Sequence, residues 1–156
     1  MRLTDVLVED NVMVDIRARA KAAALDEVVG ELALRTPGLD KARALDAILE
    51  REKLGTTGIG HGVAVPHGKV KGLGEIIVCF GRSRQGVDFE SMDALPVHLI
   101  FLILAPENSA SAHLKALAAI SQLLKGAEFR NTLMNAQGRA DIYRAIVEAE
   151  RKGVTL

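Results

Sequence analysis

The stretch from Gly58 to Lys69, GIGHGVAVPHGK, constrains the fold of this chain more than any other part of its sequence. Its three glycines at alternate positions cost backbone entropy and add no packing. The main chain here must therefore approach another group closely or take unusual dihedral angles. Pro66 then ends strand pairing because it has no N–H group, and its fixed φ sets a rigid approach to the next residue. We expect a short apolar strand that presents His67 at its end.

The chemical role of His67 stays open when only its neighbours are considered. An imidazole titrates near neutral pH, so a neutral ring nitrogen can act as a nucleophile, a general base or a metal ligand. A structural histidine in the core is a further possibility, although strand ends and adjoining loops carry functional sites more often than cores do.

Periodic segments along the chain predict one α/β domain over residues 1–156. Apolar alternation predicts a strand over residues 11–17, and continuous apolar runs predict strands over 75–81 and 97–104, the latter central in the sheet. Helical spacing predicts a helix over residues 20–35. A second helix is predicted to begin at a cap at Asp40 and to end at Gly55. Three more are predicted over about 111–125, 128–135 and 140–152. Residues 82–95 read as a polar connection in which 86–89 form a short strand or a turn. This order favours a single sandwich, with helices covering a mixed central β-sheet.

Composition excludes several classes of function. Twenty basic and twenty acidic residues cancel, so we expect no nucleic-acid partner. The single cysteine, Cys79, lies in an apolar run and is typical of a small buried residue in a reducing compartment. The amino terminus has no apolar signal region, and the longest apolar run, 97–105, is too short to cross a bilayer. We therefore expect a cytoplasmic protein without membrane insertion.

Three motifs resemble the IIA phosphocarrier domain of the bacterial phosphoenolpyruvate-dependent phosphotransferase system, of the fructose/mannitol/nitrogen type. They are the GHGVAVPHGK run, the preceding REKLG at residues 51–55 and the AHL triplet at residues 112–114. The resemblance covers nearly the whole chain. It implies a single EIIA type-2 domain, a phosphotransferase component with a phosphohistidine intermediate and no nucleotide, metal or other cofactor.

The same resemblance implies the partners. The donor is a small HPr-like phosphohistidine carrier protein, and the phosphoryl group is passed on or used as a signal. The chain carries no transmembrane permease or second carrier domain, so it looks free-standing, which favours the nitrogen-related regulatory branch with a regulated target protein. The alternative is a fructose- or mannitol-specific component that passes the phosphoryl group to a IIB unit. Two different classes stay open: a non-catalytic regulatory binding module, and a metal hydrolase with histidine ligands.

Three residues carry the chemistry that the resemblance implies. His67 accepts the phosphoryl group on Nε2, His113 holds that group without accepting it covalently, and Arg51 neutralises its charge. By the helical repeat, His113 lies near a stripe that faces the sheet, at a helix start that attracts phosphate oxygens. Arg51 extends from near the apolar stripe of its helix. A structural histidine and an arginine lying over its surface neighbours remain the alternatives.

Further residues have supporting assignments. Gly68 belongs to the turn that presents the ring, and Lys69 adds positive charge beside it. His61 departs from the family pattern. The family usually has Asn or an acidic residue at this position, which can hydrogen-bond near the active imidazole. A histidine at this position would have a pH-dependent charge. His61, His67 and His113 are also the residues of the metal alternative, although no metal motif accompanies them.

Two further expectations concern neighbouring residues. Glu52 is expected to face solvent, and His98, inside an apolar strand, to be structural. We expect Ile59, Val63 and Met92 to form an apolar rim for docking of the donor.

Overall fold

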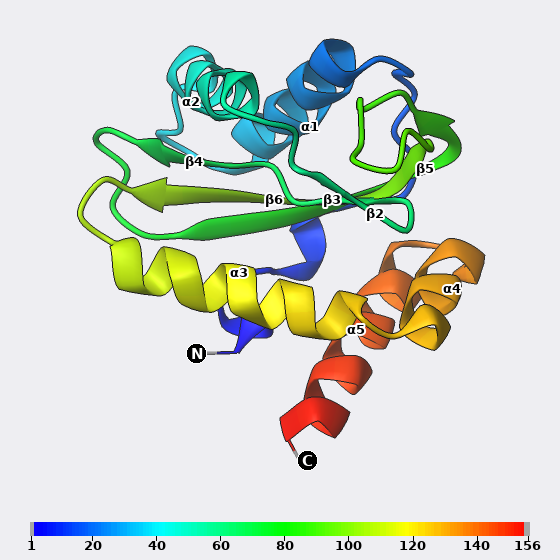
Figure 1. Cartoon of the computed structure of the whole chain (residues 1–156). Helices are drawn as coiled ribbons and strands as arrows, with labels where there is room; N and C mark the ends of the chain where they lie inside the picture. Colours follow the sequence, from blue (N-terminus) through cyan, green and yellow to red (C-terminus); the bar gives the residue numbers. More distant parts are fainter. Residues whose placement is uncertain (1, 155–156) are drawn as a thin grey trace.

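The computed structural model describes residues 2–154 and shows a mixed β-sheet with helices on both faces (Figure 1). The strands are β1 (Val12–Met13), β2 (Gly58–Gly60), β3 (Val63–Ala64), β4 (His67–Val70), β5 (Ile77–Val87) and β6 (Val97–Pro106). The helices are α1 (Lys21–Arg35), α2 (Lys41–Lys53), α3 (Ala110–Leu124), α4 (Ala127–Asn135) and α5 (Arg139–Val154), with 3-10 turns at Leu3–Asp5 and Glu9–Asn11. The predicted α/β sandwich with a mixed central sheet is confirmed.

Strand β6 is the centre of the sheet, as predicted. The order is β1-β5-β6-β3-β2, and β4 pairs with β6 beyond β3. Both β3 and β4 run parallel to β6, with Val63 opposite Leu99 and His67 opposite Ile103. β3 and β4 therefore follow the same side of β6, and the interruption at Pro66 lies between them. This arrangement places His67 at the first position of a strand.

Helices α1 and α2 cover one face of the sheet, above it in Figure 1. The predicted stripe of α1, including Val28 and Leu32, is buried in the core on that face. At the start of α2, the Asp40 carboxylate accepts the N–H of Arg43 at 3.2 Å, which is the cap that the sequence predicts.

Helices α3, α4 and α5 cover the opposite face, below the sheet in Figure 1. The predicted stripe of α3 supplies Ile120 and Leu124 to a second core, and Ile146 of α5 joins it. Phe80 and Phe101 form the ring pair of this core, with centroids 4.8 Å apart. The three predicted carboxyl-terminal helices are confirmed within one or two residues at most boundaries.

Strand β5 is longer than predicted, and β1 is shorter. Residues 82–87 continue β5 instead of forming a polar connection, because the buried guanidinium of Arg82 finds backbone acceptors. It donates to the carbonyls of Leu133 and Ala136 at 2.8 and 2.7 Å, and to that of Val14 at 3.1 Å. Of the predicted strand over residues 11–17, only Val12–Met13 form the ladder.

Candidate functional site

His67 is held by a hydrogen bond to the residue before Pro66. Its ring is half-buried, and Nδ1 lies 2.8 Å from the carbonyl oxygen of Val65. A carbonyl oxygen can only accept, so Nδ1 carries the proton and Nε2 keeps its lone pair. The rigid turn through Pro66 therefore presents Nε2 as the nucleophilic atom of the ring.

His113 faces the sheet, as the helical repeat predicts, and it lies beside His67. It belongs to the first turn of α3, is buried, and its ring centroid is 5.1 Å from that of His67 with the planes at 74°. Within residues 2–154, its buried Nε2 has no hydrogen-bond partner. Buried polar atoms nearly always have one, so this atom marks a place where a ligand oxygen can be bound.

The surroundings of His113 favour an anion. Burial lowers the pKa of His113 most, and positive charge on His67, whenever that ring is protonated, and on Lys69 lowers it further. Lys69 follows His67 by two residues in β4, so both side chains leave the same face of that strand. Two histidines and a lysine therefore share one site on the α3 side of the sheet. A bound phosphoryl group would relieve their mutual repulsion.

Gly68 points to the other face, where α2 lies. A Cβ built on Gly68 would lie 3.0 Å from the carbonyl carbon of Ala47 and 3.1 Å from its oxygen and Cβ. Such distances are too short for an alanine to fit without movement of the helix backbone. The glycine thus lets α2 approach β4 closely at the residue after His67; its support of the site remains a prediction.

Arg51 lies in the last turn of α2, one turn beyond Ala47. Its side chain is half-buried, and its guanidinium donates to the carbonyl of Gly55 at 2.9 Å. The hydrogen bond between the Val65 N–H and the Thr57 carbonyl brings the segment after α2 beside the segment that leads into His67. The structure thus places Arg51 near this end of β4 but engages it with a backbone carbonyl. Its role at a phosphoryl group remains a prediction.

His61 lies away from the acceptor, contrary to the expected contact with the active imidazole. It is exposed in the turn between β2 and β3, with a φ of 56°, and its N–H donates to the Asp93 carboxylate at 3.1 Å. The turn is bonded to β6 at Leu99, whereas the residue before His67 is bonded to β6 at Ile103. At about 3.3 Å per residue these points are roughly 13 Å apart.

The structure does not bring together His61, His67 and His113, the residues of the metal alternative. Among residues 2–154, no group of three or more His, Cys, Asp and Glu side chains is placed to hold a metal ion. His98, the remaining histidine, is bonded through Nδ1 to the carbonyl of Ser83 at 2.8 Å, which agrees with its predicted structural role.

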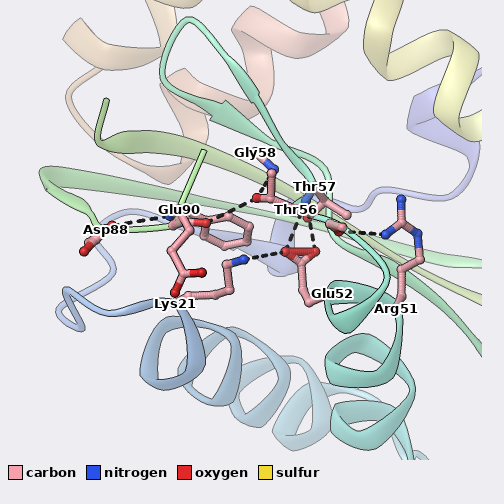
Figure 2. A network of polar contacts seen from close by, with 10 residues as sticks. Lys21, Arg51, Glu52, Thr56, Thr57, Gly58, Asp88 and Glu90 are labelled. Atoms are coloured by element: carbon pink, nitrogen blue, oxygen red, sulfur yellow. Dashed lines mark hydrogen bonds and ion pairs between the residues drawn. The ribbon is translucent and has the colours of Figure 1, made fainter. Parts of the chain in front are cut away.

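Glu52 is buried, so the expectation that it faces solvent is wrong. Each of its carboxylate oxygens lies 3.1 Å from the N–H of Thr57, and one forms an ion pair with Lys21 at 3.1 Å (Figure 2). A signal for this was present in the sequence. Glu52 follows Ile48 by four residues, which places it on the apolar face of the helix.

The expected docking rim is partly wrong. Val63 is buried in the core, whereas Ile59 and Met92 are exposed and adjoin each other at the edge strand β2, where the Met92 N–H donates to the Gly58 carbonyl. Two exposed leucines lie closer in sequence to the site residues. Leu114 follows His113 and is 67% exposed, and Leu54, at the end of α2, is 84% exposed. Neither carried a pattern that distinguishes it from other surface leucines.

The fold and the pair of histidines define a class of single-domain α/β proteins with a candidate anion site at a strand end. A model of the family "Phosphoenolpyruvate-dependent sugar phosphotransferase system, EIIA 2" matches residues 5–149. The chain belongs to this family. No helix within residues 2–154 has the length and apolar character needed to cross a membrane.

Individual relatives extend over the full domain. The chain is 39% identical to a nitrogen regulatory protein of Bradyrhizobium diazoefficiens, over 94% of this chain and 95% of that protein. It is 36% identical to the fructose-specific EIIABC component of Bacillus subtilis, over 97% of this chain but 24% of that protein. The crystal structure of the nitrogen regulatory protein IIA-Ntr from Neisseria meningitidis superimposes with a TM-score of 0.85 at 30% identity, covering 92% of this chain and 98% of that one.

Proposed function

We propose that this protein is a phosphocarrier that accepts a phosphoryl group on Nε2 of His67 from an HPr-like phosphohistidine protein. The observation that carries the proposal is the buried Nε2 of His113, which lacks a partner within the described residues although its ring lies 5.1 Å from that of His67. A phosphoryl oxygen bound to His67 would supply that partner.

The transfer step follows from the hydrogen bond of His67. The lone pair of Nε2 attacks phosphorus while the bond from phosphorus to the donor's imidazole nitrogen breaks, and the electron pair of that bond returns to the donor ring. Nδ1 keeps its proton on the Val65 carbonyl, so the positive charge that develops on the His67 ring lies beside a carbonyl oxygen. His113, Lys69 and Arg51 then offset charge on the phosphoryl oxygens.

We propose the nitrogen-related regulatory branch as the setting of this chemistry. Relatives named as nitrogen regulatory proteins match this chain over 95% and 98% of their own lengths, which supports this branch. In this setting the phosphoryl group on His67 is a signal that changes contact with a regulated target protein in the cytoplasm. The resemblance to a fructose-specific component at 36% identity favours a second candidate, transfer from His67 to a IIB unit.

The experiment that tests the phosphocarrier function is incubation with phosphoenolpyruvate and the general carrier proteins. We expect acid-labile, base-stable phosphorylation of the wild type and none of His67→Ala, whose fold should persist because the residue is half-buried at a strand end. His61→Asn is the matched control, since His61 lies away from the site and Asn tolerates a positive φ. Full phosphorylation of His67→Ala would refute the assignment. Adding a IIB unit separates the branches, because only the sugar component would pass the label on.

A further inference from the structure

We propose that the buried ion pair of Lys21 and Glu52 positions the acceptor histidine, through hydrogen bonds made by Thr57 and Val65. This inference rests on the proposed function of His67 and adds two positioning residues to it. Lys21 lies outside the three motifs of the sequence, and Glu52 lies in the one at residues 51–55.

The ion pair is the fixed end of this chain of contacts. The side chains of Lys21 and Glu52 are only 16% and 5% exposed, and the ammonium nitrogen lies 3.1 Å from the carboxylate. The ammonium group also lies over the ring of Phe89, 5.0 Å from its centroid, which adds a cation–π attraction. Lys21 begins α1 and Glu52 lies in the last turn of α2, so the pair joins the ends of both helices.

The carboxylate holds the segment that follows α2. Both oxygens of Glu52 accept the N–H of Thr57, as Figure 2 shows. The hydroxyl of Thr56 also donates to the carbonyl of Phe89 at 3.3 Å and accepts the N–H of Gly58 at 3.1 Å. The start of β2 is therefore fixed relative to α1 and α2 by side chains as well as by its ladder.

The contacts continue from this segment to the imidazole. The carbonyl of Thr57 accepts the N–H of Val65 at 3.0 Å, and the carbonyl of Val65 accepts Nδ1–H of His67 at 2.8 Å. Glu52 thus holds Thr57, Thr57 holds Val65, and the carbonyl of Val65 accepts the imidazole proton. A shift of this segment would move the Val65 carbonyl and release the ring of His67.

The energetics favour a positioning role over a purely stabilising one. Two buried charges lose much of their hydration, and apolar residues of similar size often stabilise a fold as well or better. What the ion pair adds is a carboxylate, held in place by Lys21, that makes a directional hydrogen bond with the N–H of Thr57. Because a misplacement of a reacting group by about 1 Å can cost about a hundredfold in rate, a directional contact here matters for transfer.

The test compares Glu52→Ala with a matched control, Glu50→Ala. Glu50 lies on the same helix but is exposed, and its partner Lys53 is exposed too. The first measurement needs no donor: long-range ¹H–¹⁵N NMR of the full chain reports which ring nitrogen of His67 carries the proton. The second is single-turnover transfer over a range of donor concentrations.

We expect Glu52→Ala to lower the population of the Nδ1–H form of His67 and the maximal transfer rate by about tenfold to a hundredfold, with the donor's apparent affinity unchanged. Glu50→Ala should match the wild type in both measurements. Glu52→Gln keeps an oxygen for the Thr57 N–H but loses the charge that pairs with Lys21, so it should restore only part of the Nδ1–H form. A purely structural role would lower the free energy of unfolding and leave the tautomer of the folded protein unchanged.

An unchanged tautomer and unchanged transfer rate in folded Glu52→Ala would overturn the inference. If that variant does not fold, Glu52→Asp replaces it, since the shorter carboxylate cannot reach both Lys21 and Thr57; unchanged values there overturn the inference equally. Failure of the wild type to accept phosphate would refute the proposed function, whereas the NMR measurement would still decide whether Glu52 controls the ring of His67.

Discussion

His113 shows how one buried atom combines a structural cost with a functional use. The residue is 8% exposed, its Nε2 has no partner within residues 2–154, and positive charge on His67, whenever that ring is protonated, and on Lys69 lowers the pKa of His113 beyond the effect of burial. An unpaired buried polar atom costs about 1–3 kcal/mol. A phosphoryl group on His67 would remove both the missing hydrogen bond and the repulsion.

The lowered pKa of His113 predicts a specific dependence of stability on pH. The folded state holds the ring neutral at pH values where the unfolded chain protonates it, so the unfolded state binds more protons. The contribution of His113 to stability is therefore complete above the ordinary pKa of 6.5 and is lost as pH falls through the lowered value. We expect the free energy of unfolding to decrease on acidification, and His113→Asn to reduce this slope in denaturant titrations. Equal slopes in both proteins would contradict the account.

The second prediction at this scale concerns transfer itself. In the proposed function His113 and Arg51 each donate to the phosphoryl oxygens, so His113→Ala and Arg51→Ala should each slow transfer by about tenfold to a thousandfold. Single-turnover experiments with phosphorylated donor measure the effect, and His98→Asn is the control because that ring is bonded to the Ser83 carbonyl. A variant that transfers at the wild-type rate would show that the residue it replaces is structural.

The pairing of α2 with β4 is the element-scale feature that shapes the site. Gly68 allows the helix to lie against the strand, and the residues on either side of it, His67 and Lys69, point to the opposite face. The last turn of α2 carries both Arg51 and Glu52. A small change in the distance between these two elements therefore moves the acceptor and its positioning residues relative to each other.

Gly68→Ala tests this close approach. The added methyl group would meet the Ala47 backbone at about 3 Å, and overpacking of this kind costs about 1–3 kcal/mol. We expect a lower melting temperature and slower transfer to His67. Gly74→Ala is the matched control, because nothing lies within 4 Å of its added Cβ. If Gly68→Ala is as stable as the control, the helix is not held at the distance described.

The elements themselves follow from the sequence more fully than their ends do. The helical stripes and the apolar run of β6 predict their elements because each buries a continuous apolar face. The extension of β5 through Arg82 could not be predicted, since its carbonyl acceptors lie about 50 residues away in α4 and the segment that follows. Glu52 is a different case: its place four residues after Ile48 indicated the buried face of α2, whereas its partner Lys21, on another helix, could not be predicted.

At the scale of the whole molecule, two cores lie on opposite faces of the sheet, and the half-buried His67 begins β4 in that sheet. The separation of His61 from His67 follows from the register of β3 and β4 on β6. The sequence shows only that the two histidines are six residues apart, which does not predict this separation in space. His67 and His113 could be paired in advance only through the family resemblance, because they lie on different elements. The donor must then approach the side of the sheet on which α3 lies.

This approach predicts a docking role for the exposed Leu114, beside His113. A transient complex buries less than about 1,200 Å² in total, so one charge at its centre should weaken it strongly. We expect Leu114→Glu to raise the donor's apparent KM by about tenfold, or about 1.4 kcal/mol, without lowering the melting temperature. Leu34→Glu on α1, at a similarly exposed residue, is the control. Equal KM values in the two variants would show that the donor docks elsewhere.

The central claim, that His67 presents Nε2 for phosphoryl transfer while Nδ1 stays bonded to Val65, is tested most directly by long-range ¹H–¹⁵N NMR of the phosphorylated protein. The account predicts a phosphorus-coupled Nε2 of His67 and a protonated Nδ1, because the Val65 carbonyl lies 2.8 Å from that nitrogen and can only accept. A phosphoryl group found on Nδ1 of His67, or on His113, would contradict it.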